Sequence, residues 1–173
     1  ALRNQRKPLI VMSPKSLLRH KDAASPMEDL ANGEFKRVIG EVDQLDAKKV
    51  KRVILCCGKV YYDLLAARRE KKITDIAIVR VEQLYPFPKD SLEKELAKYP
   101  KASEIVWTQE EPRNQGAWYW IASRHHLDTQ LGVKQKMLLV SRPASSSPAV
   151  GYLAKHNEQQ KALIESALGK IEY

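Results

Sequence analysis

Short apolar runs alternate with stretches of helical periodicity along most of the chain. The runs are rich in Ile, Val and Leu and are mostly continuous, without regular alternation with polar residues. Continuous apolar runs are typical of strands that are covered on both faces of a sheet. We therefore predict five strands, at Leu9–Met12, Val53–Cys57, Ile76–Val81, Ile105–Thr108 and Met137–Val140.

Between these runs, apolar residues recur at the spacing of a helix. In one stretch Val60, Tyr61, Leu64 and Leu65 fall on one side, and basic residues gather at the carboxyl end, where the helix dipole favours positive charge. Gly169 is a suitable stop for the final helix. We predict helices at Val60–Lys71, Ser91–Tyr99, Ala117–Leu127 and Leu153–Leu168.

This alternation of strands and helices predicts an α/β fold, in which a mostly parallel sheet carries helices on both faces. The length corresponds to one domain, which we place at residues 1–173, with residues 1–7 as a linker or the remnant of a helix. Phe35–Val42 follows a turn-rich stretch and is compatible with an irregular strand. Because the chain lacks an initiator Met, we expect it to belong to a longer protein.

The two cysteines indicate a reducing compartment. Cys56 and Cys57 are neighbours in an apolar run, so their side chains point to opposite faces of a strand and a disulfide between them would be strained. Cysteines used as small core residues are typical of reducing compartments. We also find no signal-peptide core and no apolar stretch near the roughly 20 residues that span a bilayer, and therefore expect no membrane association.

Positive charge is concentrated in one part of the sequence. Residues 48–72 hold nine basic residues against Asp63 and Glu70, which gives this stretch a net charge of +7. One interpretation is a surface for an acidic partner or a phosphate-bearing ligand such as a nucleotide, and the other is the solvated face of a helix with its flanking loop. We expect no nucleic-acid binding, because no recognition motif accompanies the charge.

A search for catalytic and metal-binding groups gives few candidates. His125 and His126 are adjacent on a predicted helix and diverge, and His20 and His156 are isolated, so we predict no metal site. The glycines are few and scattered, which argues against a cofactor bound on this chain alone. We predict no catalytic and no cofactor-binding residues. Lys59, at the start of a helix, is a weak candidate for binding an anion.

The most distinctive run, QEEPRNQGAW at residues 109–118, predicts an interaction surface. It places an acidic pair, a proline turn, two amides and a glycine before a cluster of three aromatic residues, which cannot all face one core. A structural role at the strand end is the alternative for the acidic pair, and packing against the domain's own loops is the alternative for the aromatic residues. The loop 142–150 follows a strand at the edge where open α/β sheets usually bind ligands. Our candidate interface residues are Glu110, Glu111, Asn114, Gln115, Trp118 and Arg142.

Five sequence blocks together resemble the E1 component of the 2-oxoglutarate dehydrogenase family. They follow the family's order and cover nearly the whole chain from about Pro8 to Leu168. The VEQLYPFP block alone would be shared with related thiamine enzymes, whereas the combination is specific. The blocks are PKSLLRH (14–20), CGKVYYDL (57–64), VEQLYPFP (81–88), QEEPRNQGAW (109–118) and RPASSSPAVGY (142–152).

The resemblance implies the carboxy-terminal domain of a transketolase-like E1 chain, a three-layer α/β unit with a mostly parallel five-stranded sheet and helices on both faces. The whole enzyme would decarboxylate 2-oxoglutarate on thiamine diphosphate and magnesium, and would transfer the succinyl group to the lipoyl group of the E2 component. The family's cofactor motif and catalytic histidines belong to earlier domains, so no catalytic residue is transferred to this chain, which by itself is expected to be inactive. The implied partners are the remainder of the E1 chain, a second E1 copy and E2, in the bacterial cytoplasm or the mitochondrial matrix. The alternative is an independent module that binds a nucleotide or an acidic partner.

Overall fold

The computed structural model describes residues 4–123 and 137–171, which divide into two compact units, 1–33 and 34–173. The first unit contains two short 3-10 helices, Lys15–Arg19 and Lys21–Ala23, and helix α1 (Met27–Asn32), and none of these elements has a buried residue. The predicted strand at Leu9–Met12 is not formed here: the segment is exposed and lies outside any helix or strand. That residues 1–173 form a single domain stays a prediction.

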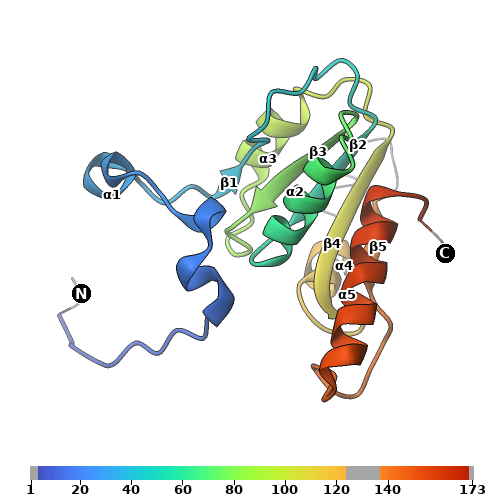
Figure 1. Ribbon diagram of the computed structural model, residues 1–173. Helices are drawn as coiled ribbons and strands as arrows, with labels where there is room; N and C mark the ends of the chain where they lie inside the picture. The colour runs from blue at the N-terminus through green and yellow to red at the C-terminus, as the bar shows by residue number, and fades with distance from the viewer. Residues whose placement is uncertain (1–3, 124–136, 172–173) are drawn as a thin grey trace. The chain divides into compact units, whose positions relative to one another are not determined.

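The second unit is built on a five-stranded sheet with the strand order β1-β3-β2-β4-β5 (Figure 1). The pairs β2–β3, β2–β4 and β4–β5 are parallel, and β1 runs antiparallel to β3. The predicted mostly parallel five-stranded sheet is confirmed, but its fifth strand comes from within 35–42 instead of Leu9–Met12. The strands are β1 (Val38–Ile39), β2 (Arg52–Cys56), β3 (Ile76–Val81), β4 (Glu104–Pro112) and β5 (Leu138–Arg142).

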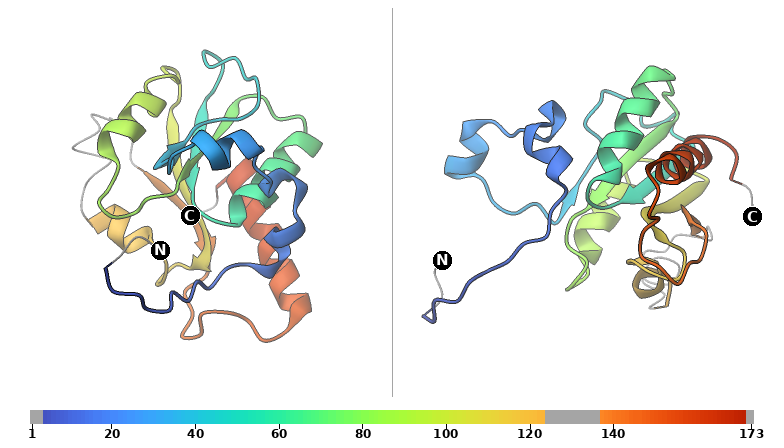
Figure 2. Two further views of the ribbon diagram at one scale, coloured as in Figure 1. Left: turned by 90° about the vertical axis from the view of Figure 1, so that its left-hand side faces the viewer. Right: turned by 60° about the horizontal axis from the view of Figure 1, so that its bottom comes forward.

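Helices cover both faces of this sheet, as predicted. Helices α2 (Val60–Glu70) and α5 (Leu153–Leu168) contact each other on one face, and α3 (Lys89–Leu96) and α4 (Trp118–Ser123) lie against the other (Figures 1 and 2). The predicted helix Ala117–Leu127 beyond residue 123, with His125 and His126, lies outside the described residues.

The core explains why the strand sequences are continuously apolar. Successive side chains of a strand point to opposite faces, so Val53 and Leu55 join the core cluster with α3 and α4, whereas Ile54 is buried on the α2 and α5 side. Trp107 is a fully buried member of the same cluster. The central positions of β2 and β4, Val53–Cys56 and Ile105–Trp107, are therefore buried on both faces, which favours apolar residues there.

A buried arginine joins the segment after β1 to α2 and β3. Arg68 is only 1% exposed. Its guanidinium donates to both carboxylate oxygens of Glu41, to Asp43 Oδ2 at 2.7 Å and to the carbonyl of Ile76 at 3.0 Å. Glu41 also accepts a hydrogen bond from the backbone N–H of Ile78 at 2.8 Å. Burial opposes the charge of Arg68, but the two carboxylates outweigh this effect and raise the pKa of Arg68.

Because of Asp43, we expect the stability that this cluster contributes to decrease at acid pH. Hydrogen bonds from Arg69, opposed by partial burial and supported by Arg68, lower the pKa of Asp43 from 3.8 to about 2. A depressed carboxyl pKa contributes stability that is complete above the unfolded value and is lost as the pH falls through the folded value. We expect the stability advantage of the wild type over Asp43→Asn to shrink by about 1 kcal/mol between pH 5 and pH 2, after allowance for solvent screening. Urea unfolding of both chains across this range measures the difference, and a constant difference would contradict it.

Candidate functional site

The two segments singled out in the sequence lie side by side at the carboxyl ends of β4 and β5. The backbone N–H of Arg113 donates to the carbonyl of Arg142 at 2.9 Å. Asn114 donates to the carbonyl of Ser145 and accepts from its N–H, both at 2.9 Å, and Gln115 donates to the same carbonyl at 3.1 Å. The candidate residues Asn114, Gln115 and Arg142 are thus brought together. Their hydrogen bonds hold the loop 142–150 against the turn after β4.

Gln109 organises this turn, although it is not one of the interface residues predicted from the sequence. Its side chain is buried, and its carbonyl oxygen accepts from Trp107 Nε1 and from the N–H of Trp118, both at 3.0 Å. Its amide donates to the carbonyls of Gln115 at 2.7 Å and Pro112 at 3.2 Å. An amide offers two donors and an acceptor in one plane, so a single side chain can satisfy both strand and turn. Its position in the sequence could have indicated this role, because it directly follows a predicted strand and directly precedes a polar turn.

Gly116 allows the chain to pass close to Gln109. Its φ is +70°, and a Cβ there would lie 2.9 Å from Gln109 Nε2. Gly58 has the same φ of +70°, but no atom lies within 4 Å of its Cβ position. The Cβ position of Gly151 is open as well, and its φ is not positive.

We expect Gly116→Ala to cost about 2 kcal/mol of unfolding free energy, because it combines left-handed strain with a close contact. Gly58→Ala isolates the backbone strain and should cost about 1 kcal/mol, whereas Gly151→Ala should cost close to zero. Denaturant unfolding of the three variants checks this order. Equal losses for Gly116→Ala and Gly58→Ala would show that the contact with Gln109 contributes nothing.

The aromatic cluster at the start of α4 divides between the core and the surface. Trp118 and Trp120 are half-buried against the core, and Trp120 Nε1 donates to the carbonyl of Leu84 at 3.0 Å. Trp120 also makes an edge contact with Tyr85, which is largely exposed, and Tyr119 is 57% exposed. The three aromatic residues therefore do not all face one core, as the sequence indicated. Tyr85 and Tyr119 present aromatic surface to solvent.

Glu110 belongs to a polar network on the opposite face of the sheet from α4. It contacts Lys59 at 2.7 Å and accepts from Gln160 Nε2 at 2.8 Å. Gln160 also donates to Asp63 at 2.8 Å, and its carbonyl oxygen accepts from Arg142 Nη2 at 2.7 Å. The network therefore links α2, β4, β5 and α5. Arg142 itself is only 8% exposed. The two terminal nitrogens of its guanidinium also lie 3.4 and 3.3 Å from Nδ1 of His156.

Lys59 is held by carboxylates of the same domain. Its ammonium lies 3.0 Å from Asp63 and 2.7 Å from Glu110. Burial acts to lower its pKa, but these two partners outweigh it and raise the pKa of Lys59 above its ordinary value. An anion at this helix start would have to compete with both carboxylates. Anion binding by Lys59 stays a prediction.

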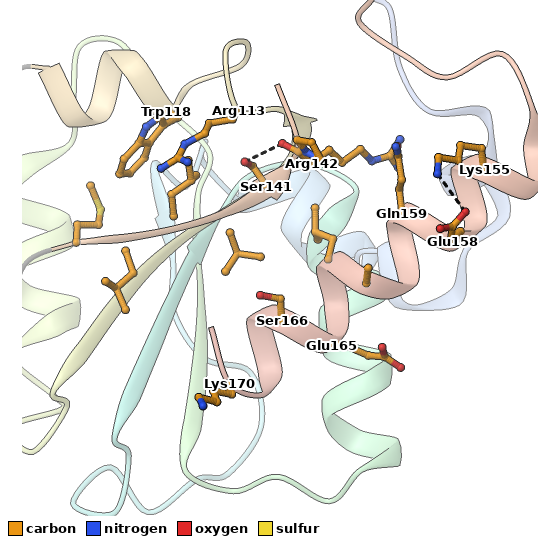
Figure 3. Close-up of a pocket in the computed structure, with 17 residues that line it drawn as sticks. Arg113, Trp118, Ser141, Arg142, Lys155, Glu158, Gln159, Glu165, Ser166 and Lys170 are labelled. Carbon is orange, nitrogen blue, oxygen red and sulfur yellow. Dashed lines mark hydrogen bonds and ion pairs between the residues drawn. The ribbon is translucent and has the colours of Figure 1, made fainter. Parts of the chain in front are cut away.

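Two hollows border this region. An apolar crevice of about 620 Å³ lies at the carboxyl ends of β2, β3 and β4, and Glu111 and Trp120 are among its lining residues. Glu111 and Glu110 therefore point apart, as expected for neighbours in a strand. A larger hollow of about 930 Å³ follows β5 and α5, with Trp118 and Arg142 among its lining residues, and Figure 3 shows Arg142 extending from β5 toward Gln159 on α5.

Internal ion pairs involve most of the concentrated positive charge. Six of the nine basic residues in 48–72 lie within 4.0 Å of a carboxylate: Lys49, Lys51, Arg52, Lys59, Arg68 and Arg69. These contacts favour the structural interpretation of the charge over a binding surface. In the described ranges, no group of three or more His, Cys, Asp or Glu side chains could hold a metal ion. No helix in this part of the chain is long and apolar enough to cross a membrane.

Comparison with known proteins shows the family to which this chain is related. The family model described as "2-oxoglutarate dehydrogenase C-terminal" matches residues 24–168. Proteins named 2-oxoglutarate dehydrogenase E1 component from Cupriavidus necator, Haemophilus influenzae and Azotobacter vinelandii are 57%, 54% and 52% identical over 96%, 97% and 96% of this chain. The matches cover only 17%, 18% and 18% of those relatives. This chain therefore belongs to the 2-oxoglutarate dehydrogenase C-terminal family.

Proposed function

We propose that the chain is the non-catalytic carboxy-terminal domain of a 2-oxoglutarate dehydrogenase E1 component. In this proposal the whole E1 chain oxidatively decarboxylates 2-oxoglutarate in the citric acid cycle and transfers the succinyl group to the lipoyl group of E2. The observation that carries the proposal is the coverage: 96–97% of this chain matches E1 relatives at 52–57% identity. The three organisms are bacteria, which supports the bacterial cytoplasm among the two compartments considered.

The surroundings of Glu110 and Cys57 support a structural role for this domain. Glu110 is held by Lys59 and Gln160, so this carboxylate is engaged within the domain. The thiol of Cys57 borders the apolar crevice, but burial, with smaller contributions from Glu111 and Glu82, raises its pKa to about 11. A thiol with so high a pKa carries little thiolate at neutral pH and is a poor nucleophile.

Thiamine diphosphate and magnesium would bind elsewhere in the E1 chain. A diphosphate bound through magnesium needs oxygen ligands for the ion and glycines where the backbone approaches the phosphates. The described residues hold no group of three or more His, Cys, Asp or Glu side chains that could bind a metal ion. Gly116 has a positive φ, but its Cβ position is bordered by Gln109. Gly58 also has a positive φ, and its Cβ position is open, but the adjacent Lys59 is held by Asp63 and Glu110, whose charges would repel a diphosphate. We therefore assign the cofactor no residue of this domain.

The exposed aromatic residues support an interface in the E1 homodimer near the approach to the active site. Tyr85 lines the apolar crevice at the carboxyl ends of the strands, the edge at which open α/β sheets place their sites, and the exposed Tyr119 precedes Trp120, which lines the same crevice. Aromatic residues are enriched in interfaces because each covers a large area with few rotatable bonds. The turn 109–118 is held rigidly by Gln109 and Ser145, so it offers a preformed surface.

A reconstitution experiment tests the proposed function. The 173-residue chain alone should not turn over 2-oxoglutarate, whereas the full-length E1 chain with thiamine diphosphate, magnesium and a lipoyl domain should form succinyl-lipoyl product. Turnover by the short chain, or none by the full-length chain, would refute the proposal. Titrating the short chain with AMP and with CoA at two salt concentrations tests the alternative module, which requires saturable binding without the other domains.

The interface is tested separately in full-length E1. We expect Tyr119→Ser to raise the dimer dissociation constant at least about tenfold, which corresponds to a loss of about 1.4 kcal/mol. Val42→Ser is the matched control, because Val42 is similarly exposed but follows β1 and lies outside α4. Sedimentation equilibrium measures both. Equal dissociation constants for the two variants would remove Tyr119 from the interface.

A further inference from the structure

The segment Leu9–Met12 exposes a continuous apolar surface. Its four side chains are 86%, 83%, 70% and 92% exposed, and the segment has neither helical nor strand structure. Contiguous exposed apolar surface of this kind marks a place where another part of a protein binds. The flanking positions are polar or proline, with Lys7-Pro8 before the run and Ser13-Pro14 after it.

The pattern of the run indicates what would cover it. In an extended chain, Leu9 and Val11 point to one side and Ile10 and Met12 to the other. A flat groove would bury only one of these sides and leave the other in water. An interior strand of a sheet with helices on both faces buries both sides and also pairs the backbone, which is the environment that continuous apolar runs are typical of.

The extent of the family match indicates where that sheet lies. The C-terminal family model begins at residue 24, so Leu9–Met12 lies outside it. The match to the Cupriavidus necator relative nevertheless covers 166 of 173 residues, which leaves about seven unmatched and therefore includes this run. The run is shared with a relative of which this chain covers 17%, and the matched domain is the carboxy-terminal one.

We propose that Leu9–Met12 is an interior β-strand of a sheet in the domain that precedes this one in the E1 chain. The inference rests on the proposed E1 membership. It assigns residues 8–13 to the preceding domain, and the following helical segment becomes the connection between two domains. It differs from our expectation from the sequence, which placed residues 1–173 in one domain with residues 1–7 as a linker or the remnant of a helix.

Hydrogen exchange tests this assignment in the full-length E1 chain. The amides of Leu9–Met12 should exchange at least about 100-fold more slowly in full-length E1 than in the 173-residue chain. The amides of β2, Arg52–Cys56, should be protected in both and serve as the internal control. Equal exchange of Leu9–Met12 in the two proteins would overturn the proposal. Turnover of 2-oxoglutarate by the same full-length sample reports separately on the proposed function.

Cysteine accessibility tests whether both sides are covered. Ile10→Cys and Val11→Cys lie on opposite sides of the extended segment, and both should react with a thiol reagent at least about 100-fold more slowly in full-length E1 than in the short chain. The wild-type protein gives the background from Cys56 and Cys57. Protection of only one of the two positions would overturn the interior strand, because it would mean docking on a flat surface. These conservative replacements also keep the test valid where a charged substitution would prevent folding.

Discussion

Replacing Arg68 by Met is expected to lower the unfolding free energy of the 173-residue chain by about 3–5 kcal/mol. The guanidinium is 1% exposed and the side chain of Glu41 is 6% exposed, so the variant leaves a buried carboxylate without its counter-charge. The carbonyl of Ile76 loses a donor as well. Because the cluster attaches residues 41–43 to β3, the β1–β3 pairing should weaken with it. Urea unfolding followed by circular dichroism measures the loss.

Arg69→Met is the matched control for Arg68→Met. Arg69 is the next residue of the same helix and donates to the same Asp43, but its side chain is 45% exposed, so its replacement should cost less than about 1 kcal/mol. Adding Glu41→Gln to Arg68→Met should recover part of the stability, since it removes the uncompensated charge. A double variant no more stable than Arg68→Met would contradict the charge-burial explanation.

Replacing Gln109 by Leu is expected to cost about 3 kcal/mol, because several buried polar groups lose their partner together. Trp107 Nε1 and the N–H of Trp118 lose an acceptor, and the carbonyls of Pro112 and Gln115 lose a donor. Leucine fills a similar volume, so packing loss contributes little. Thermal unfolding measures the total effect. The near-ultraviolet circular dichroism of the tryptophans reports the local rearrangement.

Gln115→Leu provides the comparison within the same turn. Gln115 is half-buried and its side chain donates one hydrogen bond, to the carbonyl of Ser145 at 3.1 Å, so its replacement should cost about 1 kcal/mol. If the two variants were equally stable, Gln109 would not be the organiser of the turn. In full-length E1, Gln109→Leu should also raise the dimer dissociation constant, since the proposed interface depends on a preformed turn.

The local pattern of the sequence was enough to predict the central strands and the helices. Val53–Cys57 and Ile76–Val81 are predicted within one residue of β2 and β3, because both faces of these strands are buried and every predicted position except Arg80 is apolar. The prediction for β4 ended at Thr108, four residues early. Its last residues, Gln109–Pro112, are polar or proline and belong to the strand only through the register that pairs Pro112 with Arg142.

The tertiary structure decided the fifth strand and the partners of the charges. β1 has two residues, too few to give a periodic signal, and it pairs with β3 beside the attachment of Glu41 to Arg68. The sequence of 48–72 showed an excess of positive charge, but the carboxylates that pair with Arg68 and Arg52 lie 27 and 52 residues away in the chain. Hydrophobic periodicity is a property of neighbouring residues and can be read along the chain. Ion pairs and edge-strand pairing join distant residues, so only the folded arrangement determines them.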